Sequence, residues 1–237
     1  MYATSCIYDT VYGNSAAMKG GGMSTDDIVK LVTIKREFLV KVFATLLTQL
    51  GVTYYVMTNY DREKDIKKRV PKAWVLVVAS FALILLLALV PMSIYLKFGV
   101  FTMFSGIVGV LFSSLMKLTD PNLVQMAIVG TMGIFGTFFV LGAGMLFSGV
   151  ALGLRTGLFL LASLLLLIVA MIVSYFTGEY ASSYRLLSGV GLVLFSAFVV
   201  YDTNKILQKN YYGDFVTASL DYYLDIINIF VRLLSFN

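Results

Sequence analysis

Four polar side chains recur at helical spacing near the end of the chain, inside the apolar stretch 218–236. They are Asp221, Asp225, Asn228 and Arg232. Residues three and four positions apart share a face of an α-helix, so the four would form one polar stripe. A charge near the centre of a bilayer costs roughly 2.5–3.5 kcal/mol on insertion scales. The stripe therefore indicates either a hydrated path or a specific partner, and Asp225 is its first candidate.

A second acid, Asp202, follows the apolar run 197–201 and closes the sixth predicted span. If the last two helices are neighbours, Asp202 and Asp225 can approach each other. Two carboxylates in a low dielectric cannot both ionise cheaply, so the pair would share a proton and hold the helices together. Without the proton they would repel, separate and offer the hard oxygen ligands that suit calcium. The residues alone also allow a structural role, with Asp202 among lipid headgroups and Asp225 paired with Lys205 or Arg232.

Composition places these residues in an integral membrane protein. Of 237 residues, 59% are hydrophobic and 13% charged, and the mean hydropathy is +0.88. Soluble domains are about 45–50% apolar and about 25% charged. The lipid bilayer is therefore the first predicted partner, and the net charge of +5 is assigned to loops rather than to a nucleic-acid surface.

Several classes of site are disfavoured. The chain has no histidine and a single cysteine, Cys6, so a proton switch would have to use carboxylates. No glycine-rich phosphate loop with Lys-Ser/Thr is present, and no cleavable signal precedes the first span. No energy source is therefore indicated, and we predict a protein that is not an enzyme and needs no cofactor.

Seven apolar stretches predict an all-α, seven-helix transmembrane bundle at residues 37–237, after a disordered or interfacial tail at 1–36. Within that tail, Ser24 could cap a short interfacial helix. Lys97 alone separates spans two and three, which predicts a tight hairpin there. The last helix is short and polar, which also permits a re-entrant helix. The predicted spans are Phe38–Thr58, Ala73–Leu96, Phe98–Met116, Leu123–Phe147, Thr156–Phe176, Tyr184–Thr203 and Ala218–Phe236. Glycines in spans three and four are interpreted as close-packing positions.

The C-terminal pattern resembles the closing signature of the transmembrane Bax-inhibitor-motif family, in its Lifeguard and Golgi anti-apoptotic branch. It comprises Val200-Tyr201-Asp202-Thr203, Ala218-Ser219-Leu220 and the run 223–230. Looser likenesses are Phe38-Leu39-x-Lys41-Val42 and Pro91-x-x-x-Tyr95-Leu96-x-Phe98-Gly99. The likeness spans about residues 34–236.

The resemblance implies a seven-helix, pH-sensitive calcium leak that dampens cell death from endoplasmic reticulum or Golgi membranes. It implies that Asp202 and Asp225 are the paired pore aspartates, that protons regulate them, and that Glu179 lies near the pathway mouth. Cell-death regulators would be further partners. Many members carry an arginine late in the second span, which 81–90 lacks, so Arg232 or Lys205 would have to substitute, or gating differs.

Two other functions stay open on the sequence. A non-conducting regulator could restrain death signalling through its helices and tail. An intramembrane aspartyl protease could use the same two acids, although Tyr223-Leu224 precedes Asp225 where that class carries Gly-x-Gly.

Overall fold

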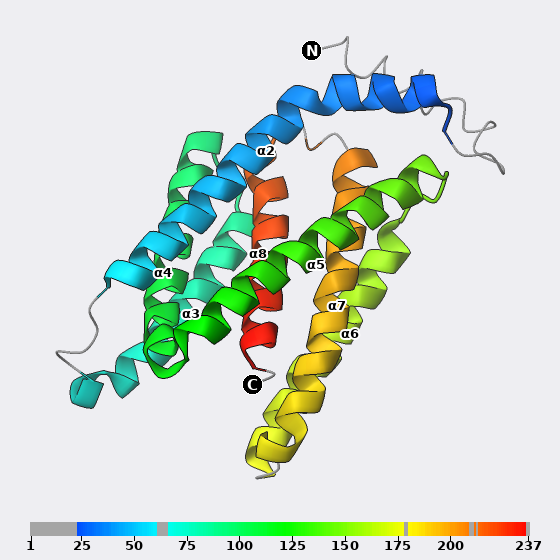
Figure 1. The fold of residues 1–237 in the computed structure, drawn as a ribbon. Coiled ribbons are helices and arrows are strands. Elements are labelled where there is room, and N and C mark those ends of the chain that lie inside the picture. The colour runs from blue at the N-terminus through cyan, green and yellow to red at the C-terminus, as the bar shows by residue number, and fades with distance from the viewer. Residues whose placement is uncertain (1–22, 61–65, 178–179, 209–210, 212, 236–237) are drawn as a thin grey trace.

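The structure is a computed structural model that describes residues 23–60, 66–177, 180–208, 211 and 213–235. Within them the chain is all-helical, with seven helices and no strand, which confirms the predicted fold class (Figure 1). The helices are α2 (Thr25–Asn59), α3 (Ile66–Leu89), α4 (Ile94–Leu118), α5 (Pro121–Phe147), α6 (Leu154–Phe176), α7 (Tyr180–Gln208) and α8 (Phe215–Leu234).

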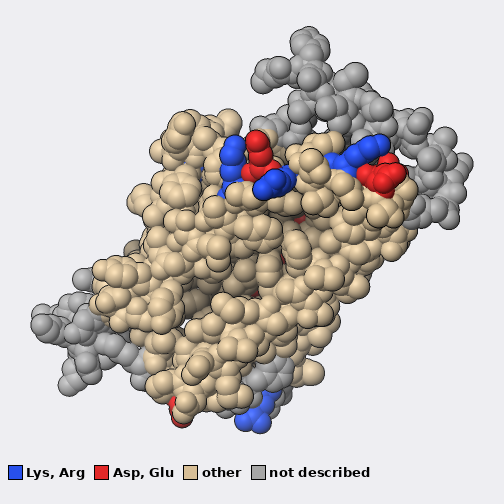
Figure 2. Space-filling view, turned by 45° about the horizontal axis from the view of Figure 1, so that its top comes forward, with Lys and Arg blue, Asp and Glu red and all other residues tan. Residues whose placement is uncertain are grey.

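Most of these helices suit a bilayer. Among the described residues, α2, α4, α5, α6 and α7 are long and apolar enough to cross a membrane, and α3 contributes a shorter apolar helix, Trp74–Leu89. Figure 2 shows charged side chains toward opposite ends of the molecule, with a broad uncharged belt between them. The protein is therefore a multi-pass membrane protein, and its apolar belt contacts lipid.

Helix α8 is the centre of the bundle. It packs against α2, α4, α5 and α7, and Figure 1 shows it behind and between α2 and α5. Every residue of α8 is buried or half-buried. This placement explains how a helix with three ionisable residues lies inside a membrane protein, since its neighbours rather than lipid surround it.

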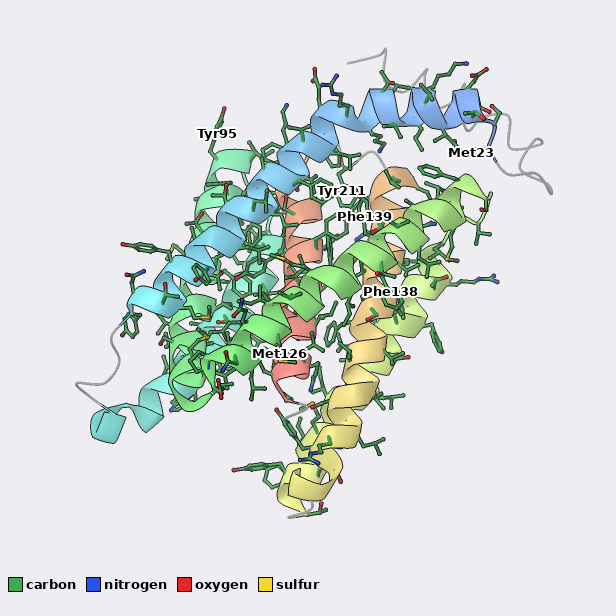
Figure 3. The ribbon with its side chains drawn as sticks, in the orientation of Figure 1. Met23, Tyr95, Met126, Phe138, Phe139 and Tyr211 are labelled. Carbon is green, nitrogen blue, oxygen red and sulfur yellow. The ribbon has the colours of Figure 1, made fainter. Side chains whose placement is uncertain are left out.

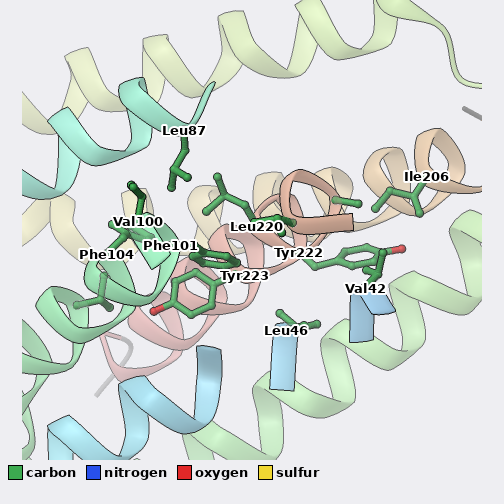
Figure 4. Packing of buried hydrophobic residues seen from close by; sticks show 13 residues of the cluster. Val42, Leu46, Leu87, Val100, Phe101, Phe104, Ile206, Leu220, Tyr222 and Tyr223 are labelled. Carbon is green, nitrogen blue, oxygen red and sulfur yellow. The ribbon is translucent and has the colours of Figure 1, made fainter. Parts of the chain in front are cut away.

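Two adjacent tyrosines of α8 anchor the main core (Figure 4). Tyr222 and Tyr223 are both fully buried. Tyr223 packs edge-on against Phe101 of α4 at 5.2 Å, and Tyr222 packs edge-on against Phe135 of α5 at 5.3 Å. Consecutive positions on a helix point about 100° apart, so this pair holds α4 and α5 on different sides of α8.

Two predicted boundaries are wrong. The hairpin between α3 and α4 turns at residues 90–93 rather than at Lys97, because Pro91 ends the helical ladder and Ser93 caps α4. Asp202 does not close its helix, since α7 continues to Gln208. The predicted cap at Ser24 is confirmed, and α2 runs from Thr25 without a break into the first span.

Glycines permit close helix contacts at several positions, and at two of them in spans three and four the neighbour is backbone; at Gly130 a Cβ atom would meet Leu233 Cδ1 of α8 at 3.1 Å. A Cβ atom at Gly142 of α5 would lie 2.6 Å from the carbonyl oxygen of Val200 on α7, and one at Gly109 of α4 would lie 2.7 Å from that of Thr53 on α2. The packing interpretation holds at these two positions. Cβ atoms at Gly106, Gly133, Gly136 and Gly144 would meet nothing within 4 Å, so these glycines are not close-packing positions.

Candidate functional site

An ion-pair cluster joins the end of α7 to the beginning of α8. Lys205 Nζ lies 2.7 Å from Asp221 Oδ2 and 3.4 Å from Asp202 Oδ1. Tyr211, in the connection between the helices, donates its hydroxyl to Asp221 Oδ2 at 3.2 Å. Of the two cations considered from the sequence, Lys205 is therefore the one that contacts the acids.

Asp225 lies one helical turn further along α8 and is only 4% exposed. Among the described residues, its Oδ2 atom is buried without a hydrogen-bond partner. It lies within electrostatic range of Asp202, Asp221 and Lys205, but no hydrogen bond between the described residues links it to Asp202. Asp202 is itself 7% exposed and lies on the neighbouring helix. The structure thus gathers the two predicted acids in one low-dielectric region and adds Asp221.

Next to the acids, Tyr222 joins the two helices. Its hydroxyl donates to Thr203 Oγ1 at 3.1 Å, and both residues are fully buried. This bond fixes the turn of α7 that carries Asp202 against the turn of α8 that carries Asp225. A change in the spacing of the two backbone segments that carry the acids therefore requires α7 and α8 to repack.

A second ion pair lies where α8 begins. Lys97 Nζ contacts Asp214 Oδ2 at 2.5 Å, and Asp214 also caps α8 by accepting from the Thr217 amide. Partial burial favours a higher pKa for Asp214, but the hydrogen bonds from Lys97 and Thr217 outweigh it and hold the pKa below its ordinary value.

Figure 3 places Tyr95 and Tyr211 toward the same end of the molecule and Met126 toward the other.

The remaining predicted site residues are placed differently. Asn228 donates its amide to Leu224 O within α8 at 2.7 Å. Arg232 Nη1 donates to Met171 Sδ of α6 at 3.4 Å, about 10 Å along the helix from Asp225. Glu179 lies outside the described residues.

The sequence analysis overlooks Asn204, which is fully buried. Its amide donates to Gly142 O at 3.1 Å and Val150 O at 3.0 Å, and its oxygen accepts from the Leu152 amide at 2.8 Å and from Gln208. These bonds tie α7 to the connection between α5 and α6. A polar residue two positions after Asp202 was the available signal.

The polar cluster is not a ready-made metal site. Among the described residues, no group of three or more Cys, Asp or Glu side chains is arranged to hold an ion. Calcium usually takes six to eight oxygen ligands.

The chain is similar to several known membrane proteins. Residues 35–236 match the family described as inhibitor of apoptosis-promoting Bax1. Bax inhibitor 1 of Schizosaccharomyces pombe is 27% identical over 86% of this chain and 76% of that protein. Mouse Protein lifeguard 4 is 27% identical, and the Golgi anti-apoptotic protein of Vaccinia virus (strain Lister) is 29% identical, each over 86% of both chains. With the all-helical bundle and the central acidic helix, the family match confirms the C-terminal resemblance: this chain belongs to the Bax inhibitor family of membrane proteins.

Proposed function

We propose that the protein is a pH-sensitive passive leak for calcium in an intracellular membrane. The observation that carries this proposal is the buried Asp225, whose Oδ2 has no hydrogen-bond partner among the described residues, on a central helix beside Asp202 and the Lys205–Asp221 pair. An isolated buried carboxylate is costly, so a residue of this kind is retained where a charge, a proton or an ion is handled.

In the proposed closed state, Asp202 and Asp225 hold one proton between them without a direct hydrogen bond, and Lys205 balances the charge around Asp202 and Asp221. Loss of the shared proton places two like charges on α7 and α8. Their repulsion separates the helices and exposes carboxylate oxygens to water and to calcium, which prefers such ligands. The hydrogen bond between Tyr222 and Thr203 resists this separation, so opening requires α7 to repack against α8.

The relatives support a cellular role for the leak. The family description and the name Golgi anti-apoptotic protein concern inhibition of cell death. We propose that this chain inhibits apoptosis by lowering stored calcium in the Golgi or the endoplasmic reticulum. A non-conducting regulator of cell-death proteins is the second candidate, because those names specify inhibition of death and no ion.

The test is calcium release from proteoliposomes between about pH 5 and about pH 8, with wild type, Asp225→Asn and Asp202→Asn. Each acid variant is expected to change the flux and to flatten its pH dependence. Asp120→Asn is the matched control, because Asp120 is an exposed cap of α5 whose role asparagine can fill. Equal flux and equal pH profiles in all four proteins would contradict the leak.

A cell-survival assay separates the two candidates. If Asp225→Asn abolishes flux but protects cells as well as wild type does, the non-conducting regulator is correct. If cell protection and calcium flux fall together, the protective activity depends on ion conduction.

A further inference from the structure

A groove lies on the membrane-facing side of the bundle, away from the ion-pair cluster. It has a volume of about 560 Å³ and lies between α2, α4, α5 and α8. Helices α2 and α5 both pack on α8, but among the described residues they are not one of the closely packed helix pairs. Ile226, Ile227 and Phe230 of α8 form the floor of the groove; Phe230 is buried, and the two isoleucines are half-buried.

The groove opens sideways toward hydrocarbon. Residues at its edges are apolar and strongly exposed: Leu47 is 68% exposed and Met132 is 70% exposed. They belong to α2 and α5, two of the helices that are apolar and long enough to cross the membrane. Phe43 of α2 meets Phe139 of α5 at 5.7 Å and brings the two helices together nearer the Tyr222 end. The groove is thus continuous with the bilayer contact of the protein.

The lining offers little to a polar ligand. No charged residue contributes to it. Its two threonine hydroxyls are already used: Thr131 donates to Ala127 O at 2.7 Å, and Thr53 lies within hydrogen-bonding distance of Gln49 O and Ser105 O. The remaining hydroxyl belongs to Tyr54, which is 56% exposed. A lining with so few polar groups favours a hydrocarbon occupant.

The setting of the groove decides which hydrocarbon reaches it. From Leu47 to Met57 the lining of α2 extends about 15 Å, at about 1.5 Å per residue. Its strongly exposed residues lie on helices long enough to cross the membrane, so bilayer acyl chains lie against it along this length without a further partner. We propose that the groove holds the acyl chain of a bilayer lipid, which completes the packing of α8. This proposal does not depend on ion conduction.

Gly51 provides a precise test. It lines the groove, and a Cβ atom there would meet nothing within 4 Å, so Gly51→Phe places a ring in open space. Gly133→Phe is the matched control: this glycine is also helical, exposed and free of neighbours within 4 Å, but it does not line the groove. Both changes have the same effect on helix propensity.

The full chain is reconstituted in phosphatidylcholine vesicles that contain a trace of phosphatidylcholine with a photoreactive acyl chain, and the labelled residues are mapped by mass spectrometry. We expect labelling concentrated on the groove, including Ile226 and Phe230, with most of it lost in Gly51→Phe and kept in Gly133→Phe. Labelling spread evenly over exposed positions such as Leu166, with none in the groove, would overturn the proposal. A crosslink from groove residues to another polypeptide would also overturn it and identify a helix as the occupant.

A second measurement covers failure of Gly51→Phe to fold. Dioleoylphosphatidylcholine added to the delipidated wild-type protein in detergent is expected to raise its thermal midpoint, because a ligand stabilises the state that binds it. Gly133→Phe should show the same rise. An unchanged midpoint in wild type contradicts the proposal without reference to the variant.

Discussion

Lys205 of α7 lies 2.7 Å from Asp221 of α8, and this pair links the two helices that carry the candidate acids. The link crosses the connection between α7 and α8, where Tyr211 adds a hydroxyl to the same carboxylate. One ammonium thus contacts two of the three neighbouring carboxylates, since Asp202 also lies within 3.4 Å of it.

Lys205→Met should destabilise the protein, because it leaves two carboxylates without their counter-ion. The loss is expected to be about 3 kcal/mol, the lower end of the range for breaking a buried pair, since the lysine side chain retains 23% exposure. Thermal or denaturant unfolding in detergent would measure it. Lys205→Arg should retain most of the stability, and adding Asp221→Asn to Lys205→Met should recover part of the loss. A loss in Lys205→Arg equal to that in Lys205→Met would show that charge is not the cause.

The pair between Lys97 and Asp214 should give a pH-dependent contribution to stability. The folded-state pKa of Asp214 lies below its ordinary value, which is about 3.9 in an unfolded chain. The contribution is therefore fully present above the unfolded pKa and is lost as the pH falls through the folded pKa. Solvent screening limits it to about 1 kcal/mol.

Asp214→Asn isolates that charge, because asparagine can still cap α8. The difference in unfolding free energy between wild type and this variant should be present at neutral pH and should vanish in acid. Lys97→Met added to Asp214→Asn should cost little more. A difference that grows as the pH falls would contradict this assignment.

Gly142→Ala should destabilise the protein by about 1–3 kcal/mol through overpacking, because its Cβ atom would lie 2.6 Å from Val200 O. Gly133→Ala, whose Cβ atom meets nothing within 4 Å, should instead stabilise α5 by about 0.5–1 kcal/mol through helix propensity. Unfolding in detergent distinguishes the two. Similar effects of both changes would show that α5 and α7 are not in close contact at Gly142.

Asn204→Ala should loosen the connection between α5 and α6. It leaves the Gly142 and Val150 carbonyls and the Leu152 amide without this partner. A buried group left unsatisfied costs about 1–3 kcal/mol, which applies to the Gly142 carbonyl, whereas Val150 is 46% exposed. Faster proteolysis within residues 148–153 would report the effect. Gln208→Ala removes the bonds from Gln208 to Leu152 O at 3.3 Å and to Asn204 Oδ1 but keeps the Asn204 bonds to the backbone, so this variant should be cleaved more slowly than Asn204→Ala. Equal cleavage of wild type and Asn204→Ala would contradict this role.

The sequence predicts the helices well because apolar length is a strong local signal. It also singles out Asp202 and Asp225, since acids in apolar surroundings are conspicuous. Asp221 was expected to line a path, and only the approach of α7 shows that it faces Lys205. The sequence does not assign a role to Asn204, because its backbone partners lie more than fifty residues away in the chain. The prediction of a turn at Lys97 is wrong because it relied on the charge of this residue, whereas Pro91 determines where the turn lies.

The enclosure of α8 has a consequence for biogenesis. Asp221, Asp225 and Arg232 make this segment a poor candidate for insertion into lipid by itself, yet none of its residues is exposed in the finished bundle. The earlier helices must therefore already surround a space that α8 can occupy when it enters the bilayer. Membrane integration of α8 is thus a step of tertiary folding. Substitutions that disrupt the packing of α2, α4, α5 or α7 should therefore first reduce the fraction of molecules in which α8 stays inserted in the membrane.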